Sequence, residues 1–146
     1  GGLMAELHII KLCVGIQSID HLRTVQTAKL AEARHGEGRL WHRTRHGPRR
    51  KDELLAGGSL YWVIGGIIKA RQKLIGFDHY VDAEGIRQCL LLLDPAIVGT
   101  AAWPHRAFQG WRYLTRKDAP PDLAEGDESN DMPDEMAREL RQLGLL

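Results

Sequence analysis

Hydrophobic and polar positions alternate along much of the chain with a period of two, the spacing at which side chains share one face of a β-strand. The clearest strand is predicted at Ser59–Ile64, an almost continuous apolar run that is followed by the glycine pair Gly65-Gly66 and a second apolar run. This pattern predicts five strands, at Glu6–Val14, Arg39–His46, Ser59–Ile64, Ile67–Phe77 and Ile86–Leu93. A sixth segment, Arg106–Leu114, alternates aromatic with basic residues and is also predicted to be β-structure.

Helices are predicted at three places. Ile19–Arg34 carries a moderately clear apolar stripe at helical spacing. A short helix is predicted at Asp52–Ala56, and another at 132–146, where acidic residues precede basic ones and so match the helix dipole. Before the aromatic segment, Ala96–Val98 is expected to form one helical turn and Gly99–His105 to be irregular.

Together these elements predict an α+β domain at residues 4–117. We expect a curved, mostly antiparallel sheet or a small open β-barrel, with the first helix packed on it. Gly65-Gly66 is expected to form either a tight hairpin or a sharp bend within one long strand. Residues 118–131 are rich in acid, proline and glycine, which predicts a linker before the C-terminal helix.

The composition is that of one globular domain: 146 residues, 43% hydrophobic and 27% charged. No apolar run approaches the ~20 residues of a membrane helix, and the start lacks the pattern of a signal peptide. We therefore expect a cytoplasmic protein without membrane contact. Cys13 and Cys89 lie in predicted strands without a CxxC spacing, so free thiols are expected, with a disulfide as the alternative.

Charge is distributed unevenly along the chain. Up to Lys117 there are 18 Lys and Arg against 10 Asp and Glu, a net charge of +8. From Asp118 onward there are 2 against 9, a net charge of −7, and the whole chain carries +1. A basic body with an acidic tail favours either a polyanion partner or a tail that shields the basic face; a tail that only adds solubility is the alternative.

The densest positive charge lies between positions 39 and 51, with six Lys or Arg and no acid. If this segment begins as a strand whose Leu40 faces the core, its other face presents Trp41, Arg43 and Arg45. Guanidinium groups bind phosphates in a bidentate manner, and an indole ring is a stacking platform for bases. This arrangement favours a nucleic-acid partner over the alternative of a solvated charged face.

Two other segments extend the basic character. Lys69, Arg71 and Lys73 stand at every second position of a predicted strand, and the aromatic segment combines Trp111 with Arg112. Solubility explains the first pattern equally well, and core packing the second. The residues expected to bind nucleic acid are Trp41, Arg43, Arg45, Arg49, Arg50, Lys51, Lys69, Arg71, Trp111 and Arg112.

A small enzyme pocket is the alternative site. His42 and His46 share one face of their predicted strand, and Tyr61 and Trp62 are candidate walls. Other histidines and cysteines that could approach them are His8, Cys13, His79 and Cys89. The chain contains no HExxH, CxxC, GxGxxG or P-loop motif, so no metal, cofactor or catalytic residue is predicted.

Several blocks carry a resemblance to a known family. The blocks "HIIKLCVG", "LWHRTRHGPRR", "ELLAGGSLYWVIGGIIKARQ", "LLLDPAIV" and "RAFQGWRYL" resemble an alphaproteobacterial family of small proteins without assigned function, domain-of-unknown-function family 1489. The resemblance covers about Leu7 to Leu123 and implies a cytoplasmic bacterial protein. "ELLAGGSLYWVIGGIIKARQKLIGF" also resembles, in a generic way, the PUA-like folds that include ASCH and EVE domains, which implies a curved β-barrel that binds RNA or modified bases.

The function expected from these observations is a non-catalytic module that binds nucleic acid, with RNA or an extruded base favoured. A strand-borne basic face without a helix-turn-helix or zinc finger suits single strands better than duplex DNA. Two alternatives stay open: an enzyme acting on a phosphorylated small molecule, and an adaptor whose C-terminal helix contacts a protein partner.

Overall fold

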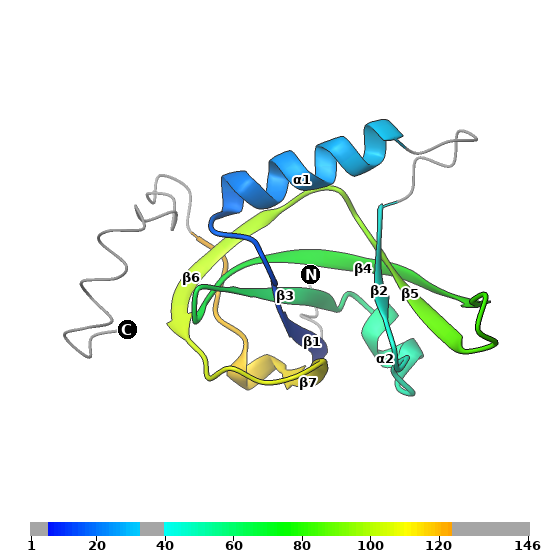
Figure 1. The fold of residues 1–146 in the computed structure, drawn as a ribbon. Coiled ribbons are helices and arrows are strands. Elements are labelled where there is room, and N and C mark those ends of the chain that lie inside the picture. The colour runs from blue at the N-terminus through cyan, green and yellow to red at the C-terminus, as the bar shows by residue number, and fades with distance from the viewer. Residues whose placement is uncertain (1–5, 33–39, 124–146) are drawn as a thin grey trace.

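The computed structural model describes residues 6–32 and 40–123, and the C-terminal helix predicted at 132–146 lies outside them. Within the described residues, seven strands and two α-helices form an α+β fold (Figure 1). The elements are β1 (Leu7–Leu12), α1 (Ile19–Glu32), β2 (Leu40–Thr44), α2 (Lys51–Leu55), β3 (Ser59–Ile64), β4 (Ile67–Val81), β5 (Arg87–Leu93), β6 (Val98–Pro104) and β7 (Trp111–Thr115).

The strands form one mixed, mostly antiparallel sheet in the order β2-β5-β4-β3-β1-β7, with β6 pairing beside β4. The β1–β3 pair is parallel, and the other pairs among these described strands are antiparallel. Strands β2 and β7 are therefore the two ends of the strand order. The structure therefore confirms the predicted α+β class and the mostly antiparallel sheet.

The long strand β4 connects the two parts of the sheet. Its first half pairs with β3 and β6, and its second half pairs with β5. A register shift between Leu74 and Gly76 marks the bend between these halves. At the other end, Gly65 and Gly66 both have positive φ and join β3 to β4 as a two-residue hairpin, so the hairpin alternative is the correct one.

Strand alternation sends neighbouring residues of β3 into different parts of the core. Leu60, Trp62 and Ile64 pack in the larger cluster, which also receives Ile19 and Leu22 of α1. Tyr61 and Val63 belong to a smaller cluster with Leu114 of β7. All six residues of β3 are buried, as its continuous apolar composition leads us to expect for an interior strand.

Three segments differ from the sequence-based expectation. The helical turn predicted at Ala96–Val98 and the irregular segment predicted at Gly99–His105 are wrong, since Val98–Pro104 is strand β6. Strand β4 continues to Val81, four residues beyond Phe77, where the predicted strand ends. In the segment expected to be a linker, Asp118 ends a 3₁₀ helix at Arg116–Asp118, and residues 121–123 run beside β6 through an isolated bridge between Thr100 and Asp122.

A buried hydrogen-bond network ties α1 to the sheet. The side-chain amides of Gln26 and Gln72 donate to each other at 2.7 Å, and the Trp62 indole donates to Gln72 Oε1 at 2.8 Å. Gln72 is fully buried and Gln26 nearly so. Each member therefore depends on the others for its polar partners.

We expect Gln72→Met to lower the free energy of unfolding by about 2–4 kcal/mol, because it leaves buried donors of Trp62 and Gln26 without an acceptor. Urea denaturation measures the change. Gln26→Met/Gln72→Met removes both amides of the pair, so its loss should be smaller than the sum of the two single losses. Additive losses would contradict a coupled network.

Candidate functional site

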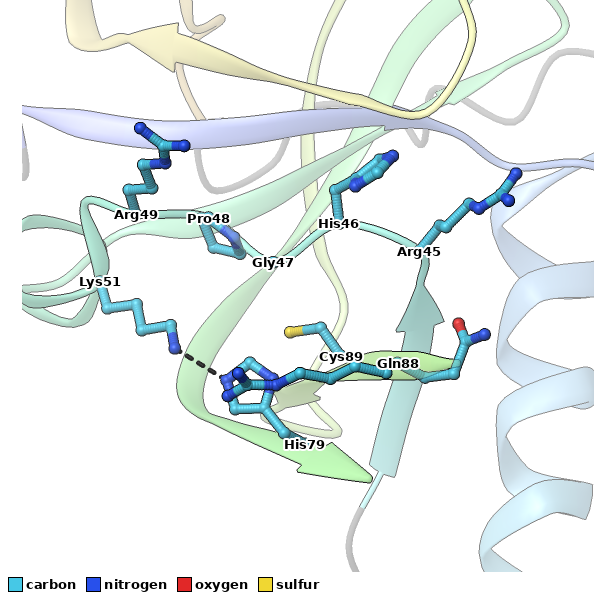
Figure 2. Close-up of a pocket in the computed structure, with 10 residues that line it drawn as sticks. Arg45, His46, Gly47, Pro48, Arg49, Lys51, His79, Gln88 and Cys89 are labelled. Atoms are coloured by element: carbon cyan, nitrogen blue, oxygen red, sulfur yellow. Dashed lines mark hydrogen bonds between the residues drawn. The ribbon is translucent and has the colours of Figure 1, made fainter. Parts of the chain in front are cut away.

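A basic cleft of about 500 Å³ lies where β2 leads into α2, against the adjoining strands β4 and β5 (Figure 2). Four cationic side chains line it, and no carboxylate does so among the residues that the structure describes. We call this hollow the basic cleft. Its lining residues are Arg45, His46, Gly47, Pro48, Arg49, Lys51, His79, Arg87, Gln88 and Cys89.

Two aromatic side chains of β7 hold the loop that forms one wall of the basic cleft. The Trp111 indole donates to the carbonyl of His46 at 2.6 Å. The Tyr113 hydroxyl accepts from the backbone N–H groups of Arg49 and Arg50 at 3.0 and 3.2 Å. The two rings meet edge to face with centroids 4.9 Å apart. The conformation of this basic loop therefore depends on β7, more than sixty residues away in the chain.

The opposite wall comes from paired positions of β4 and β5. His79 and Cys89 are register partners across these strands, and both line the basic cleft. A Cβ atom at Gly47 would lie 3.0 Å from Cys89 Sγ and 3.4 Å from His79 Cε1. Only a glycine lets the loop approach the strands this closely without displacing a neighbour (Figure 2).

Desolvation in the basic cleft favours the neutral forms of His79 and Cys89. Lys51 Nζ lies 2.8 Å from His79 Nε2 (dashed in Figure 2), so the ammonium donates to the unprotonated ring nitrogen. Desolvation, followed by the charges of Lys51 and Arg87, lowers the pKa of His79. Burial raises the pKa of the Cys89 thiol, which does not favour a thiolate nucleophile. The positive charge of the basic cleft thus resides on its Arg and Lys side chains.

A second hollow of about 480 Å³ shares Arg45 and Gln88 with the basic cleft and adds Arg43. Two carboxylates, Asp82 and Glu84, also line this second hollow. The Asp82 carboxylate stabilises a turn: it accepts from the backbone N–H groups of Glu84 and Ile86 and from the side chain of Gln88. These bonds lower the pKa of Asp82. The two hollows together form an elongated depression with Arg45 at the point where they meet.

The predicted binding residues of the first basic run lie on the surface around these hollows. Trp41 and Arg43 are exposed on β2 while Leu40 and Thr44 are buried, as the period of two predicts. Arg45, Arg49 and Lys51 line the basic cleft. In contrast, the Arg50 guanidinium forms an ion pair with Glu53 and lies over the Tyr113 ring.

The other predicted binding residues do not join the basic cleft. Lys69 is 3% exposed at an irregularity of β4, and Arg71 forms a two-point ion pair with Asp122. The row expected at Lys69, Arg71 and Lys73 is therefore not a uniform basic face. On β7, the Trp111 indole donates to the carbonyl of His46 in the loop. Arg112 is exposed, with its guanidinium over the Phe108 ring.

The four residues of the alternative enzyme pocket are also separated. His46 lines the basic cleft, whereas His42 lines a different cavity beneath α1, together with Trp62. Tyr61 packs in the smaller core cluster, beside His8. Burial lowers the pKa of His42 to about 4, and the charges of Lys11, Lys29 and Arg43 act in the same direction. His42 and His46 therefore do not converge on one substrate position.

Four cleft residues on β4 and β5 were outside the predicted site. Arg87 and Gln88 were not named at all, and His79 and Cys89 were named only as side chains that could approach the histidine pocket. The alternation of Arg87 and Cys89 along β5 shows which side chains share a face, but it does not show which strand lies next to them. That neighbour is fixed by the pairing of β5 with both β2 and β4. The sequence signal that could have found these residues is therefore the pairing register and not a motif.

The structure also shows whether the two cysteines form a disulfide. Cys13 and Cys89 are both free thiols, so the disulfide alternative is wrong. Across residues 6–32 and 40–123, no group of three or more His, Cys, Asp or Glu is placed to hold a metal ion. None of the helices in this described part has the length and apolar character needed to span a membrane.

A family comparison adds to this geometry. The family described as "Protein of unknown function (DUF1489)" matches residues 9–146, which is most of the chain. The chain belongs to the DUF1489 family. The match continues to the last residue, so the family resemblance does not end at Leu123 as expected, and the acidic C-terminal segment is part of it. Neither a curated protein nor a solved structure matches the chain.

The buried His42 gives a prediction about pH. Its pKa of about 4 in the folded protein, against 6.5 for an unperturbed group, means that only the unfolded chain takes up this proton between those values. The free energy of unfolding should fall as pH drops from 6.5 to 4, with His42 contributing up to about 3 kcal/mol. Urea denaturation across this range should show a smaller fall for His42→Phe. Identical pH profiles would contradict this assignment.

The support of the loop by β7 gives a second prediction. Tyr113→Phe removes the hydroxyl that accepts from two backbone N–H groups, so the free energy of unfolding should fall by about 1 kcal/mol. Hydrogen exchange at Arg49 and Arg50 should become faster. Tyr80→Phe is the matched control, since the Tyr80 hydroxyl accepts only from the exposed Arg43 side chain in the hydrogen bonds described. Unchanged exchange at these amides would show that the loop does not depend on Tyr113.

Proposed function

We propose that the protein is a non-catalytic module that binds single-stranded nucleic acid, RNA in preference to DNA, by its phosphates in the basic cleft. One observation carries the proposal: Arg45, Arg49, Lys51 and Arg87 surround the cleft, and its described lining holds no carboxylate. Concentrated like charge without compensation is unfavourable unless an anion neutralises it. Phosphate groups meet this requirement, and arginine binds them with two parallel hydrogen bonds.

A polymer fits this surface better than a single phosphate. The basic cleft and the second hollow share Arg45 and Gln88, so the depression extends from the loop to the β4–β5 turn. Arg43 lies in the second hollow, and Trp41 next to it on β2 is 47% exposed. A row of cations beside an exposed indole supports backbone contacts together with base stacking.

The arrangement of the helices supports a single strand over duplex DNA. Helix α1 lies across the sheet and α2 has five residues, so neither of these described helices projects as a recognition helix for a major groove (Figure 1). Unpaired RNA presents phosphates and splayed bases to a groove on a sheet surface. A PUA-like architecture and a cytoplasmic location in a bacterium are part of the same proposal, and both come from the sequence resemblances.

A second candidate is an enzyme that acts on a phosphorylated small molecule. The observation that favours it is the presence of His46, His79 and Cys89 in a cleft with four cations. The raised pKa of Cys89 and the lowered pKa of His79 do not favour a thiolate or a protonated general acid. Release of phosphate from p-nitrophenyl phosphate, lost in His79→Ala, would establish this candidate and replace the binding module.

Binding to a fluorescein-labelled oligoadenylate tests the proposal by anisotropy at two or more salt concentrations. Affinity should fall with salt, with a log–log slope of roughly −2 to −3 for four neutralised phosphates. Arg45→Ala/Arg49→Ala should weaken binding by at least about tenfold, which corresponds to ~1.4 kcal/mol, and should make the slope shallower.

Arg23→Ala is the matched control, because Arg23 is an exposed α1 arginine paired with Asp20 and lies outside both hollows. It should change affinity by less than about twofold, within the small effect typical of a remote surface charge. No binding at low salt, or equal losses in the control and the double variant, would overturn the proposal.

A further inference from the structure

A separate cavity of about 150 Å³ lies beneath α1, and we call it the α1 cavity. Leu22 and Val25 of the helix line one side. Leu40, Trp62 and Leu93, from three strands, line the other. Unlike the basic cleft, it is walled mainly by apolar side chains, so its natural occupant is an apolar or aromatic group.

One polar atom in this cavity lacks a hydrogen-bond partner. Among the described side chains, His42 Nε2 is the buried nitrogen or oxygen for which no partner is found. Burial keeps the ring neutral, with a pKa of about 4, so at neutral pH it offers one donor and one acceptor. Buried polar groups in native proteins nearly always have partners, so an orphan nitrogen on a residue that lines the cavity is a point at which an occupant can be bound.

Two polar neighbours of His42, Trp62 and Gln26, form their hydrogen bonds with Gln72. The His42 ring contacts the Trp62 indole edge to face, with ring centroids 5.1 Å apart, and the indole nitrogen donates to Gln72. Gln26, which also lines the cavity, is paired amide to amide with Gln72. The polar groups of Trp62 and Gln26 are therefore held in the Gln72 network, beside the His42 ring.

Two cations lie at the margin of the α1 cavity. Lys11 and Lys29 belong to its lining, and no carboxylate does so among the described residues. Lys29 Nζ lies 6.0 Å from the centre of the Trp41 ring, which is exposed. An occupant that matches all three features has a flat ring for the interior, a polar edge for His42 and a negative charge near the lysines.

The volume of the α1 cavity limits the size of its occupant. An apolar cavity of about 150 Å³ accepts one benzene-sized ring. A pyrimidine base is one ring with donors and acceptors along its edge, and in a nucleotide it carries a phosphate. A purine has two fused rings and would displace a wall that is held by the Gln26–Gln72 pair. Size and charge together select a pyrimidine nucleotide.

We propose that the α1 cavity binds one unpaired pyrimidine base of the nucleic-acid strand whose phosphates occupy the basic cleft. This inference rests on the proposed function and adds base selectivity to it. The two sites lie along one short stretch of chain: His42 of β2 lines one, and His46, two residues after the end of β2, lines the other. Four residues span at most about 14 Å when fully extended. The exposed side chains of Trp41, Arg43 and Arg45 lead from one to the other.

Anisotropy with oligouridylate and oligoadenylate of equal length tests base selection. The unmodified protein should bind the uridine strand at least about tenfold more tightly. Val25→Phe fills the cavity with a ring, and His42→Phe keeps the ring shape but removes the nitrogen. Both variants should lose the preference while their affinity for oligoadenylate stays unchanged, and urea denaturation confirms that each is folded.

Nuclear magnetic resonance with uridine monophosphate distinguishes base binding in the α1 cavity from phosphate binding in the basic cleft. The ring signals of His42 and Trp62 should shift with uridine monophosphate and not with adenosine monophosphate. If both strands bind equally in all three proteins, the pyrimidine site is overturned and the phosphate cleft stands. If the signals shift but neither strand binds, the α1 cavity accepts a free pyrimidine nucleotide only, and both the cleft function and the strand-borne base are overturned. No shift and no binding would overturn both.

Discussion

The hydrogen bonds between the aromatic side chains of β7 and the basic loop are the interactions on which the candidate site depends. Trp111 and Tyr113 hold the backbone at His46 and at Arg49–Arg50. Without them, this loop would have the exposed backbone and repelling charges of a mobile segment. Held in place, it presents Arg45, Arg49 and Lys51 around one depression. The two ends of the strand order are thereby joined through side chains, without strand pairing between β2 and β7.

This arrangement changes the role assigned to the aromatic residues. Trp111 is predicted from the sequence as a stacking surface, yet its indole edge is used to support the loop. Trp62 is a candidate pocket wall and is buried, where it orders the Gln26–Gln72 pair and contacts His42. The exposed indole that remains beside the cations is Trp41. Stacking and support are thus divided between aromatic residues that look equivalent in the sequence.

The sequence predicts where the strands lie in the chain better than it predicts which strands pair with each other in the sheet. Periodicity finds β3 and correctly assigns the faces of β2, because side-chain alternation is a local property. It misses β6, whose Gly- and Ala-containing sequence gives no clear period. It also treats Lys69 and Arg71 as one exposed row, whereas an irregularity in β4 buries the first and Asp122 pairs with the second. Strand pairing and distant ion pairs depend on tertiary contacts that no local pattern contains.

The central claim is that polyanion binding occurs at the basic cleft and not across the whole basic body. Backbone amide chemical-shift mapping with a short single-stranded RNA tests it most directly. The account predicts shifts concentrated at residues 45–51, 79 and 87–89, around the cleft lining. Lys73 and the Arg71–Asp122 pair should remain unchanged. Shifts concentrated around Lys73, or spread evenly over all basic residues, would contradict the account.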